Sequence, residues 1–350
     1  MRSVTVSVSK EYNVLIGGGL LSRAGAITRE VCGGEKAALV ADDIVNGLYS
    51  GAVENSLRES GYATVKFVFP HGEQSKSPET YISLLNALTE AGLSRSDPVV
   101  ALGGGVAGDL AGFAAATYLR GVPFVQIPTT VLAMVDSSIG GKTAINLPAG
   151  KNQAGAFYQP DAVICDYGTL KTLPEEIFRD GCSEIIKHAV ILSAELFELL
   201  KMPLEPQMED IITWNIMIKR DTVAADERDT GIRQILNFGH TIGHGVEKHS
   251  GYSITHGSAV AIGMSVVSRG AFRMGVCGED CHQEIVGALK RFELPYETDI
   301  LPDKLIEAAF SDKKRSGKRI NMILPEKIGK CVIKSFSLDE AADFIRLAMS

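Results

Sequence analysis

The sequence predicts an α/β domain built on a parallel sheet, followed by a mainly α-helical domain. Two observations predict this fold. Short apolar strands alternate with segments of helical period in the first half of the 350 residues, and helical period dominates from about residue 172 onward. Strands that are apolar along their whole length are typical of a parallel sheet covered by helices on both faces. The length fits two domains at about 150 residues each.

Each predicted element follows from its local pattern. Pro174 can begin a new helix, which places the boundary near 168–175 and gives domains 1–170 and 171–350. We expect strands at 36–41, 64–69, 98–102, 124–127 and 162–165, with a helix over 81–91. Beyond the boundary we expect helices at 183–200, 209–225, 235–249 and 258–274, and a strand pair at 320–324 and 330–334.

Composition excludes several classes of protein. Apolar residues make up 45% of the chain, which excludes disorder, and the formal net charge of −7 disfavours nucleic acid as a partner. The longest apolar stretch, 99–118, contains Asp109 and several glycines, so we expect no membrane span. We find no signal peptide at the N-terminus, and six cysteines are few, so we expect a cytoplasmic protein. Cys277, Cys281 and His282 leave a zinc site open, although a complete ligand set is missing.

A glycine-rich turn at 101–112 follows a predicted strand and opens a predicted helix. Such a turn lets a ligand approach the backbone, and the helix N-terminus can bind a phosphate. Asp42 ends another strand and could accept hydrogen bonds from a ribose, and Thr129 and Thr130 end a third. Tight helix–sheet packing and local capping explain the same residues equally well.

The segment 136–152 is polar and glycine-punctuated, and it contains Asp136, Lys142, Lys151 and Asn152. We interpret it as a functional loop, because it is too long for a simple connection. Its Gly-Gly-Lys-Thr run lacks the upstream glycine of a P-loop, so we do not expect ATP.

The segment 233–249 carries a polar stripe. Arg233, Asn237, His240 and His244 are spaced i, i+4, i+7 and i+11, which on one continuous helix places them within roughly 60° of each other. The opposite face is apolar, with Ile235, Phe238, Ile242 and Val246. The polar stripe therefore resembles the wall of a site more than a solvated face.

Two histidines one turn apart, His240 and His244, could share a metal ion. The residues between them lack the glutamate of the His-Glu-x-x-His motif of zinc proteases. Further ligands would come from elsewhere, with His256 and Glu184 as candidates. We interpret His188 and His249 as core or surface histidines. The basic residues allow two interpretations: they are scattered over the surface, or they converge to form a pocket for a small polyanion. These are Lys142, Lys151, Lys187, Lys219, Arg233 and 313–315.

Several motifs make the chain resemble the 3-dehydroquinate synthase family over nearly its whole length. They are GEQSK (72–76), GGGVAGDLAGFAAATYLRG (103–121), IPTTVLAMVDSSIGGKTAIN (127–146), GKN (150–152), SEIIKH (183–188), LNFGHTIGHGVE (236–247), HG (256–257) and DKK (312–314).

The resemblance implies a Rossmann-like NAD-binding domain, a helical metal- and substrate-binding domain, a site in the cleft between them and a homodimer. It implies a zinc ion, with cobalt as an alternative, on Glu184, His240 and His256, and leaves His244 to transfer protons. It implies substrate contacts from Arg120 (which can come from the partner subunit), Asp136, Lys142, Asn152, Lys187, Lys219, Arg233, Asn237, Lys313 and Lys314. It implies cofactor contacts from Asp42, Glu73, Lys76, Gly104, Gly105, Asp109, Thr129 and Thr130, to which we add Lys142 and Lys151.

The implied reaction converts 3-deoxy-D-arabino-heptulosonate 7-phosphate to 3-dehydroquinate and phosphate in the shikimate pathway. Two positions depart from the family pattern: Ser258 and Asp229 stand where glutamate is usual, which puts the fine geometry around the metal in question. The alternatives are another sugar-phosphate cyclase, such as 2-deoxy-scyllo-inosose synthase, and a metal-dependent alcohol or glycerol dehydrogenase. A metal-binding protein without activity would leave the glycine-rich turn unexplained.

Overall fold

The computed structural model describes residues 1–251, 253–310 and 319–350. The chain divides into two compact units, one formed by 1–173 with 219–228 and the other by 174–218 with 229–350. Helix α8 therefore supplies residues to both units, which the sequence did not indicate. Over the described residues, no helix combines the length and apolarity needed to cross a membrane.

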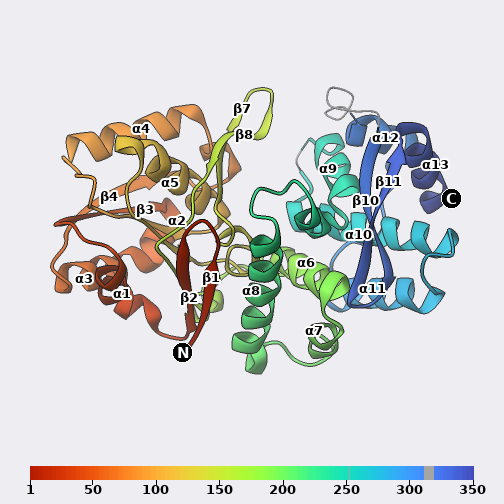
Figure 1. Cartoon of the computed structure of the whole chain (residues 1–350), viewed down its shortest axis with the longest axis horizontal. Coiled ribbons are helices and arrows are strands. Elements are labelled where there is room, and N and C mark those ends of the chain that lie inside the picture. Colours follow the sequence, from red (N-terminus) through yellow and green to blue (C-terminus); the bar gives the residue numbers. More distant parts are fainter. Residues whose placement is uncertain (252, 311–318) are drawn as a thin grey trace. The chain divides into compact units, whose positions relative to one another are not determined.

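The first unit is built on a seven-stranded sheet in the order β1-β2-β9-β6-β5-β3-β4. β1 is antiparallel to β2, and the pairs between the other neighbouring strands are parallel. Figure 1 shows this sheet with helices packed against it. The strands are β1 (Arg2–Ser7), β2 (Glu11–Gly17), β3 (Lys36–Asp42), β4 (Ala63–Phe69), β5 (Val99–Gly103), β6 (Phe124–Pro128) and β9 (Ala162–Asp166).

Alternate residues of each central strand pack on opposite faces of the sheet. Leu39 and Val100 belong to a core shared with helices α1 and α3, whereas Val40 and Val99 belong to a core shared with α4 and α5. Burial on both faces explains why these strands are apolar throughout. The helices of this unit are α1 (Ala24–Val31), α2 (Asp43–Val45), α3 (Gly51–Glu59), α4 (Pro78–Glu90) and α5 (Gly105–Thr117).

Strand order reverses between β3 and β5. The chain moves from β3 outward to β4 and then returns to the other side of β3 to form β5 and β6. In open α/β sheets, ligands bind at the carboxyl ends of the strands where the order reverses. The ends of β3 and β5 are Asp42 and Gly103, so this fold directs a ligand to the glycine-rich turn.

The segment expected to be a loop at 136–152 instead contains a β-hairpin, β7 (Lys142–Leu147) and β8 (Gly150–Phe157). Its two strands pair in antiparallel register, with Lys142 opposite Phe157. Polar, glycine-rich strands give no apolar run, so the sequence pattern did not reveal them. Close packing fixes the hairpin on the domain, because a side chain at Gly112 of α5 would lie 2.5 Å from Thr143.

The second unit is mainly helical, with one two-stranded antiparallel sheet. Its helices are α6 (Glu175–Leu192), α7 (Ala194–Leu199), α8 (Met208–Ala225, in part), α9 (His240–His249), α10 (His256–Arg273), α11 (Glu279–Arg291), α12 (Pro302–Phe310) and α13 (Leu338–Met349). Its strands are β10 (Arg319–Lys327) and β11 (Lys330–Ser337), close to the predicted pair.

Two predicted helices are interrupted. The helix expected over 183–200 ends at Leu192, and Ser193 caps a separate helix through a bond from the Leu196 N–H at 3.0 Å. The helix expected over 235–249 was wrong as a continuous element, because Gly239 is left-handed (φ 78°) between a 3-10 turn at Ile232–Asn237 and α9. Helical period does not reveal such a break, because apolar residues stay buried on both sides of it.

Candidate functional site

Three side chains from three helices meet in the second unit. Glu184 lies on α6, His240 is the first residue of α9, and His256 is the first residue of α10. The Nε2 atoms of His240 and His256 each lie 3.7 Å from the same oxygen, Oε1 of Glu184. Spacing alone does not predict this meeting, because the three residues are spread over 73 positions of the chain, whereas the family resemblance implied this set.

The donor group fits a zinc ion. Tetrahedral ligands at zinc distances lie about 3.3 Å from one another, and the ligand atoms of Glu184, His240 and His256 all lie within 4.8 Å of one another. Both carboxylate oxygens of Glu184 are buried, and no described residue donates a hydrogen bond of normal geometry to them. One carboxylate and two imidazoles form the donor set of many catalytic zinc sites, which leave a further position open.

Each imidazole is oriented through its other nitrogen. Nδ1 of His240 lies 3.1 Å from the carbonyl oxygen of Phe238, and Nδ1 of His256 lies 3.3 Å from Oε2 of Glu247. A histidine that donates from Nδ1 to an oxygen presents the lone pair of Nε2 on its far side. Both Nε2 atoms thereby face Glu184, and a metal ion that bound there would replace the Nε2 proton of His256.

Close backbone contacts set where the two histidines begin their helices. A Cβ on Gly257 would lie 2.0 Å from the carbonyl oxygen of Asp180 in α6, so only glycine allows this approach. The Asp180 carboxylate also accepts hydrogen bonds from the Ser258 N–H at 2.8 Å and from the Thr255 hydroxyl. Asp180 therefore caps α10 from a neighbouring helix and fixes the position of His256.

The left-handed Gly239 performs the equivalent role for His240. A side chain there would lie 2.8 Å from the Val260 carbonyl oxygen of α10, so the break before α9 brings the two helices into close contact. At the reciprocal position on α10, a Cβ on Gly263 would lie 2.0 Å from the Gly239 carbonyl oxygen. These glycines bring His240 within reach of Glu184.

Burial and neighbouring charges shift the pKa values of all three side chains. Burial alone would raise the pKa of Glu184, but the Lys187 ammonium, with the two imidazoles, holds it well below its usual value. Burial and then the Lys187 charge lower the pKa of His240 to about 3. Burial would lower the pKa of His256 too, yet the carboxylates of Glu184 and Glu247 outweigh it and raise that pKa to about 10.

The remaining residues of the predicted stripe are divided by the helix break. His244 is exposed and stands edge-on to His240, with ring centroids 5.5 Å apart. Arg233 and Asn237 lie on the 3-10 turn rather than on α9, where Arg233 is buried and Asn237 is exposed. The predicted apolar stripe is confirmed, since Ile235, Phe238, Ile242 and Val246 are all buried.

In the first unit, the ends of β3, β5 and β6 bring together part of the predicted cofactor set, namely Asp42, Gly104, Thr129 and Thr130. A Cβ on Gly103 would lie 3.5 Å from Oδ2 of Asp42, and one on Gly104 would lie 3.2 Å from the Thr130 methyl. Among the described residues, no side chain caps α5 at Gly104, so the amides of Gly105 and the residues after it can take an anion.

The same residues also make the local capping contacts that the sequence allows as an alternative to cofactor binding. Asp42 accepts a bond from the Val45 N–H at 2.9 Å through Oδ1. Thr130 accepts one from the Ala133 N–H at 3.2 Å, while the Thr129 N–H bonds to the Gly103 carbonyl at 2.9 Å.

A polar chain of contacts surrounds the base of the hairpin. Lys76 is buried and its Nζ lies 2.5 Å from Oδ2 of Asp109 on α5, and 3.9 Å from Glu73. Burial raises the pKa of Asp109, with Lys76 opposing that shift. Asn146, which the sequence analysis did not single out, donates to Glu73 at 2.7 Å and accepts from the Asn152 N–H at 2.9 Å.

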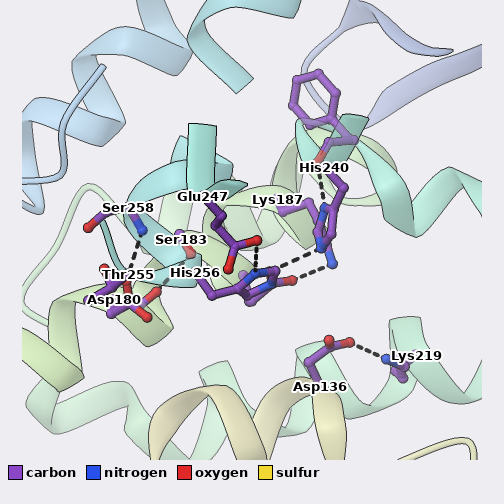
Figure 2. Close-up of polar contacts among 12 residues, drawn as sticks. Asp136, Asp180, Ser183, Lys187, Lys219, His240, Glu247, Thr255, His256 and Ser258 are labelled. Atoms are coloured by element: carbon purple, nitrogen blue, oxygen red, sulfur yellow. Dashed lines mark hydrogen bonds and ion pairs between the residues drawn. The ribbon is translucent and has the colours of Figure 1, made fainter. Parts of the chain in front are cut away.

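The other predicted substrate and cofactor residues lie on the hairpin, on a turn, in an ion pair or outside the described residues. Lys142 and Lys151 are exposed on the hairpin, and Arg120 is exposed on a turn with φ 69°. Asp136 forms an ion pair with Lys219, which belongs to the first unit (Figure 2). Lys313 and Lys314 lie outside the described residues.

The structure also describes the possible zinc site at Cys277, Cys281 and His282 and the two histidines interpreted as core or surface residues. The metal-donor groups found among the described residues do not include Cys277, Cys281 and His282, and the His282 Nδ1 lies 2.8 Å from the Ser268 hydroxyl. His188 is a core histidine, as expected, with Nδ1 2.9 Å from Oδ1 of Asn215, and His249 is exposed.

Three residues of these networks were missed from the sequence: Asp180, Glu247 and Asn146. An acid or amide within a helical or strand pattern is usually solvated, and their positions give no signal of burial. For Asp180 the only hint was its place four residues before Glu184 on the same helix face.

Comparison with known proteins assigns both parts of the chain to one group. Residues 66–180 match the model of the 3-dehydroquinate synthase N-terminal domain, and residues 181–315 match that of the C-terminal domain. A 3-dehydroquinate synthase of Enterococcus faecalis (strain ATCC 47077 / OG1RF) is 44% identical over 352 residues, covering 99% of this chain and 98% of the relative.

Two solved structures are similar to this chain over nearly its whole length. A 2-epi-5-epi-valiolone synthase from Streptomyces hygroscopicus subsp. jinggangensis 5008, with NAD+ and Zn2+ bound, is 28% identical with a TM-score of 0.87, covering 99% of this chain and 98% of that one. A 2-deoxy-scyllo-inosose synthase complexed with carbaglucose-6-phosphate, NAD+ and Co2+ is 25% identical with a TM-score of 0.85, covering 99% of each chain.

Proposed function

Since the chain belongs to the 3-dehydroquinate synthase family, we propose that it converts 3-deoxy-D-arabino-heptulosonate 7-phosphate to 3-dehydroquinate and phosphate. The observation that carries the proposal is the meeting of Glu184, His240 and His256, because the reaction needs an oxidation that a bound cation assists. The two structural neighbours, both cyclases, hold a divalent metal with NAD+.

In this proposal Glu184, His240 and His256 hold Zn2+, with Co2+ as a substitute. The bound ion supplies Lewis-acid polarisation of a substrate hydroxyl, which makes its proton easier to remove. The protein would orient His240 through the Phe238 carbonyl and keep Glu184 ionised through Lys187. His244 stands beside His240 with its side chain exposed, where it can accept or return a substrate proton.

The first unit supplies the proposed NAD+ site. The uncapped start of α5 at Gly104 and Gly105 would bind the pyrophosphate, and Asp42 would accept from the ribose. NAD+ held there would supply reversible hydride acceptance from the substrate, so the cofactor would be catalytic rather than consumed. Other proposed contacts are Glu73, Lys76, Asp109, Thr129, Thr130, Lys142 and Lys151, carried by the resemblance.

Positive side chains would hold the phosphate and carboxylate of the substrate, so that its ends are oriented for ring closure. Lys219 and Asp136 are already paired, and this pair would set the position of the ammonium. The proposed set is Arg120, Asp136, Lys142, Asn152, Lys187, Lys219, Arg233, Asn237, Lys313 and Lys314.

Two rival functions differ in substrate and in cofactor use. A 2-deoxy-scyllo-inosose synthase takes a substrate without a carboxylate, and this chain is 25% identical to one, against 44% to a 3-dehydroquinate synthase. An alcohol dehydrogenase would release NADH, and a neutral alcohol would make no use of this many cationic side chains.

One assay separates these functions. Purified protein with the heptulosonate phosphate, catalytic NAD+ and Zn2+ is expected to release phosphate with no net NADH absorbance. Stoichiometric NADH would support a dehydrogenase. Phosphate release from glucose 6-phosphate, with none from the heptulosonate phosphate, would support the inosose synthase.

We also propose a cytoplasmic homodimer, as in the family. The six cysteines, all buried and free, are consistent with a reducing compartment. Light scattering of the purified protein measures the mass, for which we expect twice the 37.4 kDa of one chain.

A further inference from the structure

We propose that Glu247 is a positioning residue that holds the imidazole of His256 in the orientation needed to bind the metal. The inference rests on the proposed metal site and adds a residue to which no catalytic or binding role was assigned. Glu247 lies on α9, seven residues after His240, and therefore on the same face of that helix. Its side chain is buried, and Oε2 lies 3.3 Å from Nδ1 of His256.

The two histidines differ in how much they need such a partner. His240 is held by the backbone carbonyl of Phe238, and its side chain is 13% exposed. His256 is the first residue of its helix, and its side chain is 35% exposed, so surrounding packing restrains its ring less. Figure 2 shows Glu247 reaching the His256 ring from α9. Without Glu247, ring rotation would be restrained mainly by contacts on the Nε2 side.

Geometry separates this role from that of a ligand. An imidazole binds one ion through one nitrogen, and its two nitrogens point in divergent directions. Nε2 of His256 faces Glu184 at 3.7 Å, whereas Glu247 faces Nδ1 at 3.3 Å. Glu247 therefore cannot share the ion that Glu184 and Nε2 bind. It forms a carboxylate–histidine pair, which fixes the tautomer and raises the basicity of the ligating nitrogen.

The same arrangement gives α9 two tasks. Its first residue supplies a metal donor, and its second turn fixes a donor that belongs to α10. The cap by Asp180 fixes where α10 begins, and Glu247 fixes the ring that projects from that start. Backbone position and ring orientation of His256 are thus controlled by separate carboxylates.

The test measures zinc affinity directly, by competition with a chromophoric chelator, in the full-length protein. We expect Glu247→Ala to weaken zinc binding about 10- to 100-fold, the range found for partners of ligating histidines. Glu247→Gln keeps an oxygen acceptor and should stay within about threefold of the wild type. Should Glu247→Ala fail to fold, Glu247→Asp replaces it, since the shorter side chain keeps the charge but loses reach.

Val246→Ala is the matched control, because Val246 is buried on the same helix but packs in the apolar core. It should lower the melting temperature without changing zinc affinity. The Co2+-substituted proteins give a second signal, since the absorption bands of Co2+ report ligand geometry and should change in Glu247→Ala only.

A double-mutant cycle shows whether the effect passes through His256. In a His256→Ala background, Glu247→Ala should cause no further loss of zinc affinity. Wild-type affinity in Glu247→Ala, or an equal loss in both backgrounds, overturns the inference while leaving the metal site standing. If His240→Ala and His256→Ala both bind zinc as tightly as the wild type does, the metal site and the inference are overturned together.

Discussion

Lys187 and Glu184 form an ion pair one turn apart on α6, and each side chain is only 1% exposed. A buried carboxylate without a positive partner is costly, and Lys187 holds the pKa of Glu184 low despite that burial. The pair keeps a proposed metal ligand ionised before any cation binds. It also places a positive charge beside His240, which helps to keep that imidazole neutral and able to act as a ligand.

Replacing Lys187 with methionine should therefore destabilise the second unit. We expect a loss of about 3–5 kcal/mol in the free energy of unfolding, because the buried Glu184 loses its fully buried positive partner. Trp214, the single tryptophan, lies on α8 in the same unit, so its fluorescence during urea unfolding reports this change.

Lys201→Met is the control for the Lys187 variant. Lys201 pairs with Glu198 at the same i,i+3 spacing, but the two side chains are 41% and 66% exposed. The expected change is below about 1 kcal/mol. Equal effects of the two substitutions would show that burial of the Lys187 pair does not matter.

Removal of one histidine should separate a ligand from a proton carrier. His240→Ala should lose zinc and activity together, because Nε2 of His240 points to the shared Glu184 oxygen. His244→Ala should keep about one zinc per chain and lose activity, because the exposed His244 ring lies beside the donor group rather than completing it. Metal analysis after exhaustive dialysis measures the first quantity. Loss of zinc from His244→Ala would mean that the two roles are exchanged.

Much of the fold could be predicted because burial leaves a direct trace in the sequence. The central strands are apolar on both faces, and β3, β5, β6 and β9 each began and ended within about one residue of expectation. Strands β1 and β2 were not predicted, because alternate residues are exposed and neither strand forms the continuous apolar run that marks the central strands. The polar hairpin β7–β8 was read as a loop for the same reason.

The candidate site was predictable in residue type more than in geometry. The stripe of Arg233, Asn237, His240 and His244 depended on one continuous helix, and the left-handed Gly239 breaks it. Periodicity records which residues are buried, and that pattern survives a break. Glu247 and Asp180 could not be found from spacing, because their partners come from other helices.

The proposed NAD+ turn predicts a defect that is local to cofactor binding. Gly104 has φ −75°, a value that alanine adopts easily, so Gly104→Ala should change stability little. Its new methyl group would lie 3.2 Å from the Thr130 methyl, at the start of α5 where the pyrophosphate should bind. We expect NAD+ affinity to fall about tenfold, or about 1.4 kcal/mol, measured by titration calorimetry.

Gly51→Ala is the matched control for the NAD+ turn. Gly51 also begins a helix of the first unit, and apart from its chain neighbours and its own helix backbone, no described atom lies within 4 Å of a Cβ built there. Its NAD+ affinity should equal that of the wild type. If Gly104→Ala binds NAD+ equally well, the pyrophosphate does not contact this turn.

The contacts of Asp97 lead to a prediction of how the stability of the first unit depends on pH. Its buried carboxylate accepts hydrogen bonds from the N–H groups of Glu35 (2.8 Å), Lys36 (2.9 Å) and Ser94 (2.6 Å). It thereby ties the start of β3, whose other end carries Asp42, to the turn that leads into β5. Burial alone would raise the pKa of Asp97, but these donors lower it below the ordinary value of 3.8.

A carboxylate whose pKa is lower in the folded protein stabilises it above the unfolded pKa, and this contribution is lost as the pH falls through the folded pKa. Asp97→Asn should therefore cost about 1.5–3 kcal/mol at pH 7, and the difference from the wild type should shrink below about pH 3.8. Urea unfolding followed by circular dichroism between pH 3 and 7 measures it. Asp221→Asn, with a side chain 66% exposed, should change stability by less than about 1 kcal/mol throughout. A difference for Asp97→Asn that stays constant down to pH 3 would show that the charge of Asp97 contributes nothing.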